Sequence, residues 1–201
     1  MNTTPGFRLE KVAEADFPSE FGFFRIYGFR GEWQGRAEEA VALRMGDLAG
    51  EPPLVRIHSQ CLTGDVFHSL RCDCRAQLEI ALETIAAHGR GLLIYEHQEG
   101  RGIGLLNKLR AYELQDGGAD TVEANVRLGF ESDLRSYQLP GHILRYFGLT
   151  SVRLMSNNPE KVAAVKLAGV AVAELVPCIA DEVDTRAAYL ATKRDKMGHL
   201  L

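Results

Sequence analysis

The sequence predicts an α/β fold: a single domain with a mixed β-sheet flanked by helices and with antiparallel strands at its N-terminus. Strand patterns alternate with helical patterns after residue 50, which is typical of a sheet covered on both faces. Before that point the patterns are those of strands and turns, which favours antiparallel pairing. The length of 201 residues suits one domain with a sizeable core, divided into a strand-rich part over 1–50 and a second part over 51–201.

The strands are read from apolar and aromatic runs bounded by turn residues. Scattered aromatic residues between Phe21 and Leu48 predict strands joined by a glycine-rich turn near residues 28–35. Shorter apolar runs predict further, largely buried strands. These are residues 54–58, 91–95, 152–155 and 170–176.

The helices are read from apolar residues at helical spacing and from their caps. In the helix predicted over residues 76–88, Leu78, Ala81 and Ile85 fall on one stripe and Gly89 marks the end. In the helix predicted over residues 159–167, Asn158 is the expected N-cap and Pro159 the first helical residue. The predicted helices span residues 76–88, 105–114, 139–147, 159–167 and 185–196.

Composition excludes several classes of protein. A net charge of −4 argues against a general nucleic-acid binder, which normally carries a basic face. No run of about 18 apolar residues is present, so we expect no membrane span. The N-terminus lacks the apolar segment of a secretory signal, and four cysteines, three of them crowded, do not resemble a disulfide framework. We therefore expect a cytoplasmic protein with reduced thiols.

Three clustered cysteines, Cys61, Cys72 and Cys74, are the strongest chemical signal in the chain. A catalytic zinc keeps three protein ligands and one open position, so this spacing favours a working zinc site. An alternative is a structural zinc site with four protein ligands, in which His58, His68 or Cys178 is the fourth. The other alternative to metal binding is that the three cysteines are free thiols that pack in the core as small hydrophobic residues.

Two polar runs could bind phosphate. The glycine-rich run 98–104 follows a predicted strand and opens a predicted helix, and Arg101 adds a planar cation suited to phosphate. A tight turn with a solvated Arg101 would explain the same pattern. The run 156–161 combines a helix N-terminus with Lys161, although ordinary capping by Asn158 explains it fully.

Two further features favour structural explanations when they are read alone. Asp133 and Arg135 are best explained as a surface ion pair. Tyr112 shares a helical stripe with Leu105 and Leu109, which favours core packing. Zinc together with two phosphate-binding runs nevertheless suggests metal-assisted hydrolysis of a nucleotide.

The motifs in their order resemble those of the GTP cyclohydrolase II family. The resemblance covers residues 56–201 and includes Arg-Ile-His-Ser-Gln-Cys-Leu-Thr-Gly-Asp at 56–65 and Arg-Cys-Asp-Cys at 71–74. It continues with Gln-Glu-Gly-Arg-Gly-Ile-Gly at 98–104, leading to Asn107 and Lys108. The remaining matches are at residues 120–125, 128–130, 157–159 and 196–201.

The resemblance implies an activity and a set of site residues. The family converts GTP into a 2,5-diamino-6-ribosylamino-pyrimidinone 5′-phosphate, formate and pyrophosphate, which is the first step of riboflavin synthesis. Residues 51–201 would be the catalytic part. The cysteine triad would hold zinc, Asp133 would be the general base, Arg135 the nucleophile on the α-phosphate, and Tyr112 a catalytic tyrosine. Magnesium with the triphosphate and a homodimer are also implied. Substrate contacts map onto Arg56, Ile57, His58, Ser59, Gln60, Gln77, Glu99, Gly100, Arg101, Thr121, Ser156 and Lys161.

Three positions depart from the usual family pattern, and two alternative functions remain. Gln60 replaces the usual Glu, Arg75 the usual Gly and Ser156 the usual Thr, and none of these changes removes a ligand or a catalytic group. One alternative is a relative that opens the imidazole ring but stops at the formylated pyrimidine. Because Tyr112 is present, this ranks second. The other is a non-catalytic GTP-binding or zinc-storage protein.

Overall fold

The computed structural model describes residues 6–131 and 133–180, and they form two compact units. The first, which contains the β-sheet and is called the sheet unit, comprises residues 6–58, 79–97 and 137–178. The second, which contains the three clustered cysteines and is called the thiol unit, comprises residues 59–78, 98–131, 133–136 and 179–180.

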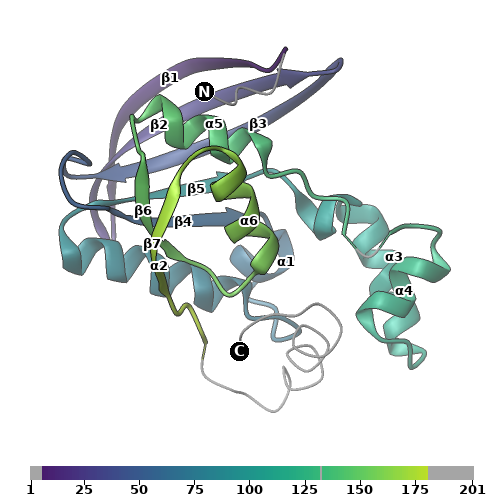
Figure 1. The fold of residues 1–201 in the computed structure, drawn as a ribbon. Helices are drawn as coiled ribbons and strands as arrows, with labels where there is room; N and C mark the ends of the chain where they lie inside the picture. Colours follow the sequence, from purple (N-terminus) through teal and green to yellow (C-terminus); the bar gives the residue numbers. More distant parts are fainter. Residues whose placement is uncertain (1–5, 132, 181–201) are drawn as a thin grey trace. The chain divides into compact units, whose positions relative to one another are not determined.

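A mixed sheet dominates the sheet unit (Figure 1). Within the described residues it has seven strands in the order β1-β2-β3-β5-β4-β6-β7. The pairs β1–β2, β2–β3 and β3–β5 are antiparallel, whereas β4–β6 and β6–β7 are parallel. The predicted fold class, with its antiparallel N-terminal strands, is confirmed. The strands are β1 (Arg8–Ser19), β2 (Gly22–Trp33), β3 (Arg36–Met45), β4 (Leu54–Ser59), β5 (Gly91–Glu96), β6 (Ser151–Met155) and β7 (Ala171–Val176).

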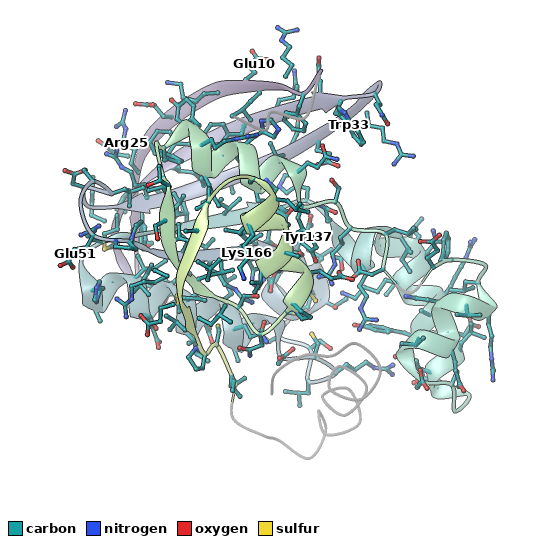
Figure 2. The ribbon with its side chains drawn as sticks, viewed as in Figure 1. Glu10, Arg25, Trp33, Glu51, Tyr137 and Lys166 are labelled. Carbon is teal, nitrogen blue, oxygen red and sulfur yellow. The ribbon has the colours of Figure 1, made fainter. Side chains whose placement is uncertain are left out.

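The antiparallel end of the sheet differs from the sequence prediction in two details. Strand β1, an edge strand that is mostly exposed, was not predicted. The turn between β2 and β3 is confined to Gln34 and Gly35, both with positive φ, rather than spread over residues 28–35. Arg25 of β2, labelled in Figure 2, bonds to the carboxylates of Glu14 and Asp16 on β1, each at 2.7 Å.

Helices cover both faces of the sheet. One apolar cluster joins Leu139 and Ile143 of α5 and Val165 of α6 to inward-facing residues of the strands. On the opposite face, a Cβ added to Gly91 would lie 2.9 Å from the Ile85 side chain of α2, so this helix packs closely against β5. These helices are α2 (Cys74–His88), α5 (Gln138–Tyr146) and α6 (Pro159–Leu167).

The thiol unit is built from short helices and loops. Small residues of α3 and α4, with Ala119 between them, form its apolar cluster. Helix α4 was not predicted, although Asp120 and Glu123 form a capping box at its start. None of the described helices has the length and apolar character that crossing a bilayer requires. The elements are α1 (Leu62–Asp65), the 3₁₀ turn η1 (Glu99–Gly102), α3 (Leu105–Asp116) and α4 (Thr121–Arg127).

The other predicted strands and helices are present with boundaries shifted by one or two residues. Asn158 caps α6 as expected, accepting a hydrogen bond from the Glu160 N–H at 2.8 Å. The predicted helix over residues 185–196 and the motif at 196–201 lie outside the described residues.

Candidate functional site

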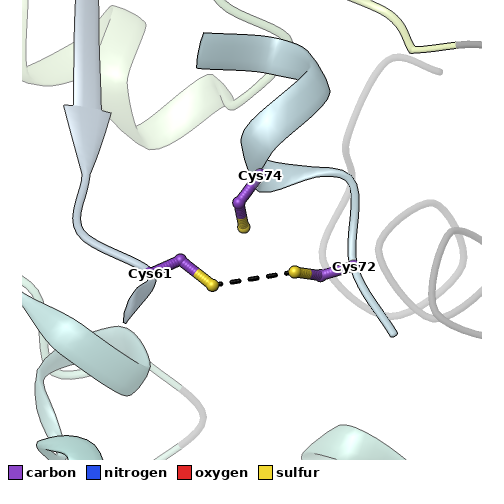
Figure 3. A group of neighbouring side chains, drawn as sticks. All are labelled: Cys61, Cys72 and Cys74. Atoms are coloured by element: carbon purple, nitrogen blue, oxygen red, sulfur yellow. Dashed lines mark hydrogen bonds between the residues drawn. The ribbon is translucent and has the colours of Figure 1, made fainter. Parts of the chain in front are cut away.

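Three thiols of the thiol unit converge on one point (Figure 3). Cys61 directly precedes α1, Cys72 lies in the following loop, and Cys74 opens α2. Their sulfurs lie within 4.8 Å of one another, and those of Cys61 and Cys72 are 3.6 Å apart. Two thiolates on one tetrahedral zinc would be about 3.8 Å apart, since each Zn–S bond is about 2.3 Å long. The cluster could therefore hold such a metal.

Gly64 allows the thiols to approach so closely. A Cβ at this position would lie 2.9 Å from the Cys72 sulfur and 3.1 Å from the Cys61 sulfur. Asp65 also orients Cys61, because its carboxylate accepts the Cys61 N–H at 3.0 Å. Gly64 and Asp65 thus help to hold the three thiols close together.

The structure does not support the alternative of a closed site with a fourth protein ligand. Among the described residues, the group with metal-ligand geometry comprises the three thiols, without His58, His68 or Cys178. The last of these, in the sheet unit, is fully buried, and its backbone bonds to the Asn157 side chain. A three-thiol set fits an open site better than a closed structural one.

A buried ion pair adjoins the thiols. The Lys108 ammonium donates to Cys61 Sγ at 3.1 Å and to Glu99 Oε1 at 2.7 Å. Both carboxylate oxygens of Glu99 are used within the protein, since Oε2 accepts the Leu62 N–H at 2.6 Å and Oε1 also accepts the Gly100 N–H. This network fixes the backbone next to Cys61 and places a cation beside its sulfur.

The thiol pKa values are driven apart by their proximity. Hydrogen bonds from Cys72 and Cys74 and the Lys108 charge hold the pKa of Cys61 far below its ordinary value. Its hydrogen bond to Cys61 raises the pKa of Cys72 to about 11, and the same neighbour raises the pKa of Cys74. Burial alone would lower the pKa of Lys108, but the Cys61 charge and the Glu99 hydrogen bond raise it instead. In the metal-free cluster, Cys61 is therefore the favoured thiolate.

Tyr112 lies near the thiols and outside the apolar cluster of the thiol unit, so the preference for core packing that the helical stripe alone gave was wrong. Its hydroxyl lies 3.2 Å from the Thr63 hydroxyl, which in turn lies 3.6 Å from Cys61 Sγ. Leu109 on the same stripe is 44% exposed. The guanidinium of Arg71 lies over the Tyr112 ring, 4.8 Å from its centre. Burial raises the pKa of the phenol, which keeps its proton available at neutral pH.

Asp133 and Arg135 form a largely buried ion pair, so the preference for a surface pair was also wrong. The two side chains are only 9% and 11% exposed. Arg135 donates to the Asp133 carboxylate through Nε, at 2.9 Å, and also through Nη2. Its Nη1 lies 3.5 Å from the Ser59 hydroxyl. Burial would raise the pKa of Asp133, but hydrogen bonds and charge from Arg135 outweigh burial and lower it.

The glycine-rich run forms a turn of left-handed residues. Gly100 and Arg101 have φ of 62° and 60°, and Gly102 and Gly104 have φ of 89° and 82°. The idea of a solvated Arg101 is wrong, because its Nη1 and Nη2 are buried and have no partner among the described residues. Buried donors of this kind are costly unless a ligand accepts from them.

The remaining predicted contacts of the thiol unit are partly structural. Gln77 donates to the Asp73 carboxylate at 2.6 Å. Arg75, which is a departure from the family pattern and not a predicted contact, donates to the Asp65 carbonyl at 3.0 Å. Gln60 is partly buried beside the first thiol, and Thr121 opens α4.

Other predicted contacts lie in the sheet unit. Arg56 donates to the Met155 carbonyl at 2.9 Å, and Lys161 donates to the Ile57 carbonyl at 2.8 Å. Ser156 accepts the Asn158 N–H at 3.1 Å. Arg56, Ile57, His58, Ser156 and Lys161 are all buried. The first three lie on β4, Ser156 directly follows β6, and Lys161 lies on α6.

Sequence reasoning missed the roles of Lys108 and Thr63. Lys108 precedes Tyr112 by four residues on α3, so the two side chains share a helix face. That spacing, beside a cysteine cluster expected to be anionic, was an available signal. No local signal connects Thr63 to Tyr112, because the two are 49 residues apart.

Comparisons with known proteins agree with these motifs. The sequence profile of a family described as GTP cyclohydrolase II matches residues 10–177. Proteins named GTP cyclohydrolase-2 from Pseudomonas entomophila (strain L48) and Haemophilus influenzae (strain PittGG) are 55% and 51% identical. The alignments cover 94% and 96% of this chain, and 92% and 90% of those proteins. A solved two-domain 3,4-dihydroxy-2-butanone 4-phosphate synthase from A. baumannii gives a TM-score of 0.47 at 19% identity, over 86% of this chain and 40% of that one, which is too weak to support an argument.

Proposed function

The chain belongs to the GTP cyclohydrolase II family of hydrolases, and from this we propose that it hydrolyses GTP with zinc. The products would be 2,5-diamino-6-(5-phospho-ribosylamino)pyrimidin-4-one, formate and pyrophosphate, in the first step of riboflavin biosynthesis. The observation that carries the proposal is the convergence of three thiols beside Tyr112 in a chain of this family.

Zinc is the proposed metal, held by Cys61, Cys72 and Cys74. Soft thiolates at tetrahedral spacing favour it over magnesium, which prefers oxygen ligands. When bound, zinc supplies a Lewis acid and a water that ionises near neutral pH. Magnesium would accompany the triphosphate instead.

The side chains around the thiols have distinct proposed roles. Tyr112 keeps its proton at neutral pH and can donate it, or a hydrogen bond, to a group that reacts beside the cluster. Arg135 presents a permanent cation for the α-phosphate, oriented by Asp133. A guanidinium is a poor nucleophile while protonated, so Asp133 would have to accept a proton for any covalent step.

Substrate contacts are proposed on residues of each unit, and the whole chain is proposed to be one functional domain. In the thiol unit, Arg101 offers buried donors suited to phosphate. The other proposed contacts there are Ser59, Gln60, Gln77, Glu99, Gly100 and Thr121, with Glu99 acting through its backbone because its carboxylate is already used. Those of the sheet unit are Arg56, Ile57, His58, Ser156 and Lys161. We also propose a homodimer, and a cytoplasmic location because free thiols persist in a reducing compartment.

The test is an assay of zinc-loaded protein with GTP and magnesium in which formate, pyrophosphate and the diaminopyrimidine are measured together. Equal amounts of all three support the proposal. A formylated pyrimidine without formate would identify the truncated reaction, and GTP binding without turnover a non-catalytic protein. If the protein is an enzyme, the Cys72→Ser variant should lose formate production. If it only binds GTP, the variant should still bind GTP, and neither form should make formate.

A further inference from the structure

Two loops of the thiol unit are joined by one glutamine side chain. Gln98, which follows β5 and precedes η1, accepts the Ser136 N–H at 2.7 Å through Oε1 and donates to the Ser136 carbonyl through Nε2. The side-chain amide thus bonds to both backbone groups of one distant residue. Only a side chain with a donor and an acceptor at this length can do so.

Backbone contacts extend the same junction. The Leu134 N–H donates to the Arg101 carbonyl at 3.0 Å. Gly102, with φ of 89°, packs so closely that an added Cβ would lie 3.0 Å from both the carbonyl carbon and the oxygen of Leu134. The glycine-rich turn and the loop that carries Asp133 and Arg135 are therefore held together at successive points.

The junction joins the two segments that carry a cation each. Arg101 lies on one loop and Arg135 on the other, and the Arg101 charge contributes to lowering the pKa of Asp133. Asp133 neutralises Arg135 within the protein, whereas the buried Nη atoms of Arg101 have no partner among the described residues. Two cations that are directed at one anionic ligand repel each other, so contacts of their segments have to hold them in place.

We propose that Gln98 is a positioning residue that fixes Arg135 relative to the Arg101 turn, so that both guanidiniums address one polyphosphate. The inference rests on the proposed function for its chemistry and deepens it. Gln98 itself needs no contact with substrate. It acts by removing the freedom of the 133–136 loop, and a displacement of about 1 Å at such a site lowers a rate by up to about 100-fold.

The kinetic test uses Gln98→Met, which keeps the side-chain length but loses both hydrogen bonds. Pyrophosphate release is followed in a single turnover with enzyme in excess, because that rate constant does not depend on the fraction of active protein. We expect it to fall about 10- to 100-fold with GTP affinity changed much less. The matched control is Gln34→Met in the exposed β2–β3 turn, which should leave the rate unchanged.

A second readout does not need activity. Amide hydrogen exchange at Ser136 and Leu134 should lose protection in Gln98→Met, whereas Gln98→Glu, which can still accept the Ser136 N–H, should retain part of it. Unchanged exchange together with an unchanged release rate would overturn the inference. If the wild-type protein released neither pyrophosphate nor formate, the proposed function would fall, and exchange would still decide whether Gln98 holds the loop.

Discussion

The ammonium nitrogen of Lys108 lies 3.1 Å from the sulfur of Cys61, inside a largely buried part of the thiol unit. Three thiolates on Zn²⁺ carry a formal charge of −1, which would make a bound water less acidic than three neutral histidines would. A neighbouring cation offsets that charge, and its hydrogen bond withdraws electron density from the sulfur. With the proposed zinc bound, Lys108 would supply part of the electrostatic assistance that an all-thiolate site requires.

Replacing Lys108 with methionine should weaken zinc binding. The change removes the donor to Cys61 and leaves the buried Glu99 carboxylate without its cation, so we expect a loss of about 10- to 100-fold in affinity. Competition with a chromophoric chelator measures it. The control is Arg153→Met, which breaks the Arg153–Glu174 pair of the sheet unit. Equal affinity in Lys108→Met and the wild type would contradict the assigned role.

Gly64→Ala should impair the metal site more than the fold. The added methyl would lie within 3.2 Å of atoms of all three cysteines, so the thiols must separate to admit it. Zinc content after dialysis reports the effect, with near-wild-type far-UV circular dichroism. Gly28→Ala is the matched control, since an added Cβ there meets nothing within 4 Å. Full zinc occupancy in Gly64→Ala would show that the cluster can expand without loss.

Arg135→Ala should abolish pyrophosphate release. Removing a preorganised donor to a reacting phosphate costs about 100- to 1,000-fold in rate. Arg135→Lys keeps the charge but loses the two-pronged contact with Asp133, so it should recover only a small part of the activity. Melting temperatures of both variants check the fold, because Asp133 loses its partner. Normal turnover of Arg135→Ala would remove Arg135 from the mechanism, whereas normal turnover of Arg135→Lys would show that the charge alone is needed.

Tyr112→Phe should separate ring opening from formate release. The hydroxyl beside Thr63 is lost while the ring and its contact with Arg71 remain. We expect the formylated pyrimidine to accumulate and formate to fall about 100-fold, as for loss of a general acid. Mass spectrometry of the products measures both. Tyr146→Phe, an exposed position on α5, is the control, and unchanged formate release in Tyr112→Phe would leave the phenol without a role.

His142 should make the fold less stable at mildly acidic pH. Burial, with the charge of Arg145, lowers its pKa from 6.5 to about 4. The unfolded chain therefore binds a proton first as pH falls, so stability is full above pH 6.5 and is lost down to about pH 4. Because the ring is partly exposed, the loss should be about 1 kcal/mol. His142→Phe keeps a ring for the stack with Phe7, 3.8 Å away, and should lose this part of the pH dependence of urea unfolding.

Much of the fold was predictable because local patterns decide it. The capped helix at Asn158 and the buried strands β5 and β6 follow from short-range rules. Strand β1 was missed because its charged residues lie on an exposed edge, where burial does not impose an apolar pattern. Helix α4 was missed although its capping box was visible in the sequence.

The roles of individual site residues were harder to predict than their presence. Spacing indicated the cysteine cluster, but it favoured a core for Tyr112 and a surface for Asp133. In both cases a contact with a residue or loop distant in sequence decides the environment. Hydrophobic periodicity depends only on local spacing, so it cannot predict such contacts. The family motifs, which occur in a fixed order, imply them.

The separation of 3.6 Å between the sulfurs of Cys61 and Cys72 has a consequence for handling the protein. A disulfide needs about 2.05 Å, so a modest movement would let an oxidant join two of the three ligands. The bond would consume half of the chain's four thiols and leave a single sulfur for a metal. Bound metal would then act as a protecting group, and preparations stripped by a chelator should be kept under reductant to regain zinc.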